Sequence, residues 1–268
     1  MSELQTFFES AKLPVMSEVA QALVRTLNDP DSTAHQVQAI ISRDPALTAN
    51  LLRLANSAQF GLSRQVVSLD HAISLIGMSR IRALALSTGI KAAFPQVPGL
   101  DRTAFWRFNM ACAGFAQWLA GGAGIDPQEA WLAGMMLRLG ELLIGQRSPD
   151  VFAEIEAANR VAQARWEHEQ RVLGFDEAQV TAVLAKYWNF PDHIITGLQN
   201  ASAPLQTQPF EPLAGVVHLA ALLADHPDPS ADVVADLPLD LVGALEINRH
   251  WMVSQFPRVE SFVDTSDL

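Results

Sequence analysis

The chain has 268 residues, 49% of them hydrophobic, and a formal net charge of −11. Residues 1–95 carry a net charge of +1 and residues 96–268 a net charge of −12. Because the acidic second half repels a phosphate backbone, the charge argues against direct nucleic-acid binding. No apolar stretch reaches the ~20 residues that span a bilayer, so no membrane insertion is expected. The single cysteine, Cys112, excludes an internal disulfide, and without a signal-peptide core at the N-terminus we expect a cytoplasmic protein.

Helical periodicity recurs along the whole chain, whereas no alternating strand pair with a turn signal occurs. Thr33 and Gln36 form an expected capping box, and Asp44 and Ser68 are expected N-caps. The expected helices run, in chain order, over residues 17–27, 33–41, 44–61, 68–77, 79–94, 103–120, 126–142, 148–170, 176–188, from 191 onward, 213–224 and 239–253. The sequence therefore predicts an all-α protein.

The segment from Arg43 to Gly77 carries the most specific pattern. Asp44-Pro45 begins a helix with proline at its first position, and Gly61 is expected to end that helix. The motifs DPALTxxLLRLANSAxFG and SLDxAIxLIG resemble those of the HDOD family, the output domain related to HD-type metal phosphohydrolases. This resemblance implies a multi-helix HDOD fold in which an N-terminal helical lobe packs on an HD-like helical lobe.

The resemblance also implies a domain organisation. An HDOD domain is expected at residues 9–205, with lobes at about 9–95 and 101–205. A proline-containing connector then leads into residues 206–268. We expect this last segment to form a C-terminal helical extension packed on the HD-like lobe.

HD-type hydrolases bind divalent metals through histidines and aspartates, and the metal activates water and holds the phosphate oxygens. The resemblance places the metal-ligand positions at Phe108, Leu137, Arg138, Glu177, Asn200, Ala201 and Ala221. Leucine cannot ligate a metal, arginine repels one, and of this set only Glu177 is a metal ligand. The seven histidines are scattered, without an HxxxH or HExxH arrangement. We therefore expect no metal, no cofactor and no catalytic residue.

Arg138 and Glu177 have opposite charges at positions that the resemblance brings together. A guanidinium buried alone is costly, and a hydrogen-bonded carboxylate offsets much of that cost. We therefore expect an Arg138–Glu177 ion pair where the family's metal stands. The alternative is that both side chains extend to solvent.

Without a metal site, the resemblance implies a non-catalytic regulatory module of bacterial signal transduction that acts through protein–protein interaction. Its partner would be an unknown signalling protein met in trans. One alternative is a sensor that binds a nucleotide or another small ligand in the vacated metal pocket, with Arg138 contacting an anion. A more distant alternative is a metal-dependent phosphohydrolase with an unrecognised site.

Asn56, Ser57 and Arg64 lie at or beyond the end of the helix that starts at Pro45. In one interpretation they belong to a contact surface in the loop from Gln59 to Val67. In the other, Asn56 hydrogen-bonds the loop backbone and holds two helices together. The sequence favours the structural interpretation.

Overall fold

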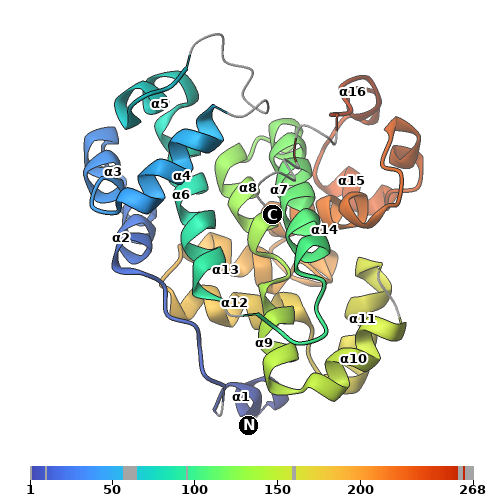
Figure 1. The fold of residues 1–268 in the computed structure, drawn as a ribbon. Helices are drawn as coiled ribbons and strands as arrows, with labels where there is room; N and C mark the ends of the chain where they lie inside the picture. The colour runs from blue at the N-terminus through green and yellow to red at the C-terminus, as the bar shows by residue number, and fades with distance from the viewer. Residues whose placement is uncertain are drawn as a thin grey trace. The chain divides into compact units, whose positions relative to one another are not determined.

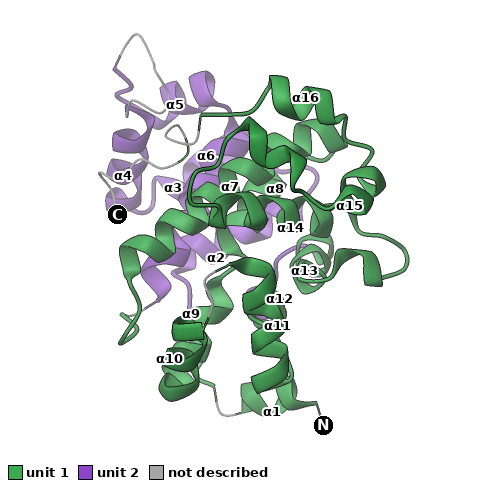
Figure 2. Ribbon diagram, turned by 90° about the vertical axis from the view of Figure 1, so that its right-hand side faces the viewer, with its two compact units in different colours: residues 1–13, 96–186, 192–268 green, residues 14–95, 187–191 purple. Residues whose placement is uncertain are grey.

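The computed structural model describes residues 2–9, 11–56, 65–94, 96–158, 161–258 and 262. Every regular element within these ranges is a helix (Figure 1), as the periodicity predicted. The chain divides into two compact units (Figure 2): unit 1 holds residues 1–13, 96–186 and 192–268, and unit 2 holds residues 14–95 and 187–191. Residues 206–268 share one unit with residues 96–186, and residues 187–191 belong to the unit that holds residues 14–95.

Unit 2 consists of α2 (Glu18–Leu27), α3 (Ala34–Ile41), α4 (Pro45–Ala55), α5 (Leu69–Ile76) and α6 (Met78–Ala93). Their first turns are fixed locally: the expected caps at Asp44 and Ser68 and the Thr33–Gln36 capping box all form. Gly77 has a φ of +92°, which permits the 117° bend between α5 and α6. Among the described residues no single helix is long and apolar enough to cross a membrane, although α5 and α6 pass that test as a bent pair.

Unit 1 contains the helices that build the candidate site. They are α1 (Glu3–Glu9), α7 (Arg102–Ala123), α8 (Pro127–Met136), α9 (Leu139–Arg147), α10 (Pro149–Ala158), α11 (Ala162–Leu173), α12 (Glu177–Tyr187, whose last residue belongs to unit 2), α13 (Asp192–Gln199), α14 (Pro212–Asp225), α15 (Leu239–Ala244) and α16 (Arg249–Ser254), with short 3-10 turns at Pro204–Gln206 and Ala231–Ala235. The long helix α7 packs against both α8 and α14 (Figure 1). Gly134 allows a close approach of α8 to α7, because a Cβ there would lie 2.8 Å from the carbonyl oxygen of Cys112.

Three helices that the sequence predicted as continuous are each two helices in the structure. The expected helix 126–142 is α8 and α9, 148–170 is α10 and α11, and 239–253 is α15 and α16. In one straight helix Glu156 and Arg165 would lie about 13 Å apart along the axis. They form an ion pair instead, which requires α11 to turn back toward α10. At the third break Glu246 has a φ of +56°, a left-handed conformation that local sequence does not favour.

Candidate functional site

The junction between α8 and α9 places Leu137 and Arg138 against the start of α12. Thr181 Oγ1 donates to the carbonyl oxygen of Leu137 at 2.9 Å, and the amide of Gly140 donates to Thr181 Oγ1 at 2.7 Å. A Cβ on Gly140 would lie 2.1 Å from the carbonyl oxygen of Glu177, so only glycine allows this approach. The break between α8 and α9 therefore points Arg138 at the first turn of α12.

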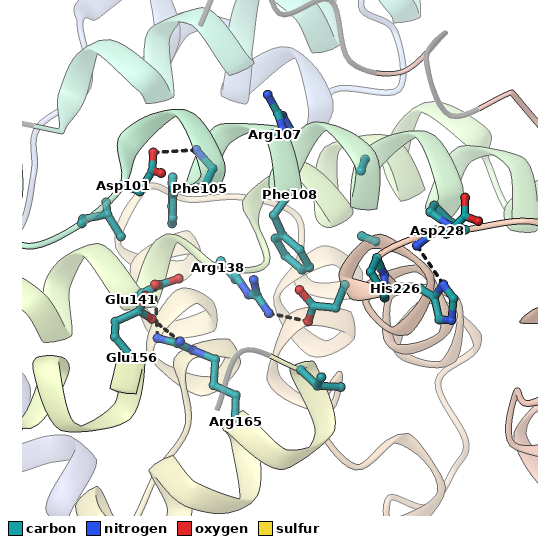
Figure 3. Close-up of a pocket in the computed structure, with 18 of the residues that line it drawn as sticks. Asp101, Phe105, Arg107, Phe108, Arg138, Glu141, Glu156, Arg165, His226 and Asp228 are labelled. Carbon is teal, nitrogen blue, oxygen red and sulfur yellow. Dashed lines mark hydrogen bonds and ion pairs between the residues drawn. The ribbon is translucent and has the colours of Figure 1, made fainter. Parts of the chain in front are cut away.

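Arg138 lies between two carboxylates and an aromatic ring from three other helices. Its Nε donates to Glu177 Oε1 at 3.3 Å, and its Nη2 donates to Asp225 Oδ2 at 2.6 Å. Its guanidinium carbon lies 3.4 Å from the centroid of the Phe108 ring (Figure 3), a cation–π geometry. Arg138 is 8% exposed and Glu177 is 0% exposed, so neither side chain extends to solvent. Asp225 lies one helical turn after Ala221, the position where the family resemblance implied an aspartate.

A second arginine, Arg165, lies beside this pair. It contacts four carboxylates: Glu141 at 3.2 Å, Glu169 and Glu177 at 3.1 Å each, and Glu156. Trp166 Nε1 donates to Glu177 Oε1 at 3.2 Å, so the Glu177 carboxylate accepts from both arginines and from the indole. The charge cluster thus consists of Arg138, Glu141, Glu156, Arg165, Glu169, Glu177 and Asp225.

The charge cluster contains more carboxylates than cations: five acidic groups against two arginines, a net −3 if all are ionised. Burial raises the pKa of Glu141 to about 8, although Arg165 opposes the shift. Burial also raises the pKa of Glu169 well above its usual range. Burial raises the pKa of Asp225 as well, although the nearby Arg138 lowers it. Burial alone would lower the pKa of Arg138, but Asp225 and Glu177 outweigh it and raise that pKa. The cluster therefore favours bound protons or another source of positive charge.

The residues present do not fit the metal of HD-type hydrolases. Phe108, Leu137 and Ala221 offer no ligand atom on their side chains, and the Arg138 guanidinium holds the Glu177 carboxylate. Across the described part of the chain, no group of three or more His, Cys, Asp or Glu residues is arranged to hold a metal ion. Two expected positions remain, Asn200 and Ala201, and the carbonyl oxygen of Ala201 lies 2.7 Å from His218 Nδ1.

His218 is a core histidine. It is 6% exposed, its ring centroid lies 5.1 Å from that of Trp166, and burial lowers its pKa. A neutral imidazole suits this environment, because a buried unpaired imidazolium would be costly.

A cavity of about 960 Å³ adjoins the charge cluster. Arg138, Glu141, Glu156, Arg165 and Asp225 line its inner part, and Figure 3 shows most of these side chains converging below α7. Its apolar wall includes Leu100, Phe105, Phe108, Val161, Pro227 and Pro257. A volume of this order suits a small organic ligand.

Sequence reasoning named Arg138 and Glu177 but missed the other members of the charge cluster. Arg165 and Glu169 are spaced i,i+4 on a strongly charged segment, which is typical of a solvated helix face. Asp225 ends an apolar helix and resembles a polar helix terminus. The only available signal was the spacing of Arg165 and Glu169 beside the bulky Trp166.

Asn56 lies in unit 2 and caps the end of α4. Its Nδ2 donates to the carbonyl oxygen of Val66 at 2.8 Å, and its Oδ1 accepts from the amide of Val66 at 2.7 Å. The helix expected to reach Gly61 ends at Ala55, because Asn56 turns to bond the chain ten residues later. Ser57, Gly61 and Arg64 lie outside the described residues.

Comparison with known proteins identifies the family. The model of the HDOD domain matches residues 13–204, and the chain belongs to the HDOD family. A crystal structure from Shewanella amazonensis SB2B, provisionally named a phosphohydrolase, is 32% identical with a TM-score of 0.78, and the match covers 94% of this chain and 92% of that one.

Two further relatives share less sequence. A Marinobacter aquaeolei VT8 structure, provisionally named a signal transduction protein, is 20% identical with a TM-score of 0.80, covering 97% of this chain and 63% of that one. An uncharacterized protein of Treponema pallidum is 24% identical over 214 residues, which are 78% of this chain. The match spans 41% of the Treponema protein, or about two fifths of its length.

Proposed function

We propose that this chain is a non-catalytic regulatory module of bacterial signal transduction that acts through protein–protein interaction. The observation that carries the proposal is the Arg138 guanidinium, bonded to Glu177 at 3.3 Å and to Asp225 at 2.6 Å where a hydrolase of this fold would hold its metal. A fixed cation in that place repels a divalent ion and engages the carboxylates that would bind it. The fold is then retained for its surface, and the partner is a signalling protein met in trans.

Hydrolysis is the competing candidate, favoured by the name of the Shewanella relative at 32% identity. Phosphoester hydrolysis on this scaffold needs a metal to lower the pKa of a water and to neutralise the phosphate oxygens. Glu177 is the one ligand-type residue at the expected positions, and it accepts hydrogen bonds from Arg138, Arg165 and Trp166. Because two arginines and an indole already engage the Glu177 carboxylate, these bonds support a non-catalytic role over hydrolysis.

Metal content and activity test the non-catalytic part of the proposal. The purified chain, incubated with Mn²⁺, Fe²⁺ or Mg²⁺ and desalted, is expected to retain no stoichiometric metal by elemental analysis. It is also expected to hydrolyse bis-p-nitrophenyl phosphate no faster than a blank. About one metal per chain, lost in Glu177→Ala but kept in the exposed control Glu154→Ala, would overturn the proposal.

Association tests the regulatory part. In the native host, chemical cross-linking of the tagged full chain is expected to recover a defined signalling protein. Sedimentation of the two purified proteins should then give a complex of fixed stoichiometry without added nucleotide. If cross-linking recovers only abundant unrelated proteins, the interaction role fails, even if the chain lacks activity.

A further inference from the structure

The inner part of the cavity is lined by three carboxyl groups and two arginines. Glu141 lies on its wall and is 4% exposed. Its carboxylate forms an ion pair with Arg165 Nη2 at 3.2 Å, and Arg165 is shared with three further carboxylates. A buried carboxylate that shares its cation with three others is incompletely compensated, and a donor in the cavity would add a hydrogen bond to it.

The cavity's inner cations are already engaged. Arg138 is held by Glu177, Asp225 and the face of Phe108, and Arg165 by four carboxylates. At the rim, the exposed Arg107 and Arg258 are matched in number by the exposed Asp101 and Asp228. An anionic ligand, such as the nucleotide considered from the sequence, would therefore enter a site lined by more carboxyl groups than arginines. The charges favour a cation.

The apolar wall defines the rest of the ligand. Phe105, Phe108 and Leu100 lie on or before the first turns of α7, and the exposed Val161 and Pro227 also line the cavity. Aromatic faces also attract cations, and Phe108 already has a guanidinium over its ring. These surfaces suit a ligand with a hydrocarbon or aromatic body.

We propose that this cavity binds a small organic cation, a primary amine or guanidinium on an apolar body, whose charged group donates hydrogen bonds to Glu141. The binding site goes beyond the regulatory role, which stands without a ligand. Without the cation, protons relieve the negative surplus, because burial raises the pKa of Glu141. Cation binding then ionises Glu141 and releases about one proton.

The groups facing Glu141 come from several helices. Arg138 precedes α9, Glu156 lies on α10, Arg165 on α11, and Glu177 on α12. Burial is the main cause of the raised Glu141 pKa; Glu177 and Glu156 raise it further, and the two arginines lower it. Affinity for the cation is therefore expected to rise with pH, by up to about tenfold per unit below the pKa of Glu141.

The experiment measures binding of agmatine and tyramine, with AMP as the anionic counter-probe. Calorimetry of the full chain at pH 6.5 and pH 8.5, in two buffers of different ionisation enthalpy, gives affinity and protons released. We expect at least one cation to raise the melting temperature, to bind more tightly at the higher pH and to release about one proton. AMP is expected to produce none of these three effects.

Three variants locate the site. Glu141→Gln is expected to weaken cation binding about tenfold or more and to abolish proton release. Glu154→Gln, a carboxylate 59% exposed on α10, should leave both unchanged. Val161→Arg changes an exposed wall residue and is expected to weaken binding without disturbing the charge cluster, which covers the case in which Glu141→Gln fails to fold.

The proposal is overturned if neither cation stabilises the chain, if AMP alone does, or if Val161→Arg or a folded Glu141→Gln binds as the wild type does. These outcomes are separate from the regulatory role, which depends on metal content and on the protein complex. A chain that binds no cation but forms its complex would keep the regulatory function and lose only the ligand.

Discussion

Replacing Arg138 by methionine removes the cation between Glu177 and Asp225 and keeps an unbranched apolar side chain against Phe108. In the wild type the guanidinium is 3.3 Å from one carboxylate and 2.6 Å from the other, and the side chain is almost fully buried. The substitution leaves both carboxylates in place with one cation fewer. It therefore measures how far the fold depends on charge compensation at this position.

Removing one partner of a buried ion pair costs about 3–5 kcal/mol. Two features place this variant near the lower limit: Glu177 keeps its bonds to Arg165 and Trp166, and Asp225 can take up a proton. We expect a loss of about 3 kcal/mol in the free energy of unfolding near pH 8.

This loss is expected to depend on pH. Burial already raises the pKa of Asp225 while Arg138 holds it down, so removing Arg138 raises that pKa further. A carboxyl with a raised folded pKa stabilises the fold at low pH and loses that contribution as pH rises through the folded pKa. The deficit of the variant should therefore shrink, by about 1 kcal/mol or more, from pH 8 to pH 5.

Urea unfolding at both pH values, followed by circular dichroism and tryptophan fluorescence, measures these quantities. The control is Arg102→Met, at an exposed position on α7, which should stay within about 0.5 kcal/mol of the wild type. The double variant Arg138→Met/Asp225→Asn should show a coupling of about 1–3 kcal/mol. A deficit equal at both pH values, with no coupling, would refute charge compensation by Arg138.

Three further predictions concern other positions. Because burial raises the pKa of Glu141 to about 8, unfolding experiments should find the wild type more stable at pH 6 than at pH 8. Glu141→Gln should reduce this dependence of the unfolding free energy on pH by up to about 1.4 kcal/mol per pH unit. An unchanged pH dependence would contradict the raised pKa of Glu141. Asn56→Ala removes the side chain that hydrogen-bonds the amide and carbonyl of Val66, and it should lower the free energy of unfolding in urea by about 1–3 kcal/mol. Binding of the signalling protein per folded molecule should stay the same. A variant as stable as the wild type would count against the structural role of Asn56. Gly140→Ala should prevent α9 from packing on α12 and lower the melting temperature sharply. The control Gly121→Ala, with open space around its Cβ, should be neutral or slightly stabilising. Similar melting temperatures for the two variants would be inconsistent with the close approach of α9 to α12 at Gly140.

The sequence by itself determined the family and most helix beginnings. Asp44, Ser68 and the Thr33–Gln36 pair act on their own first turns, so their hydrogen bonds depend on neighbours within three residues. The sequence predicted the breaks between helices less well than the helix beginnings. The chain turns between α8 and α9, and again before α16 at Glu246, without a proline or glycine that would reveal the break.

The family resemblance also predicted which metal-ligand positions are substituted, because it assigns those positions from short sequence motifs. It predicted that Arg138 and Glu177 would be close, and the two lie 3.3 Å apart. Only the tertiary structure decided that Asp225 and Arg165 join them and that the surplus charge is negative, because these contacts join residues 12 to 87 positions apart. Periodicity records which face of a helix is apolar, but a buried charge is stabilised by whichever distant helices the fold brings to it.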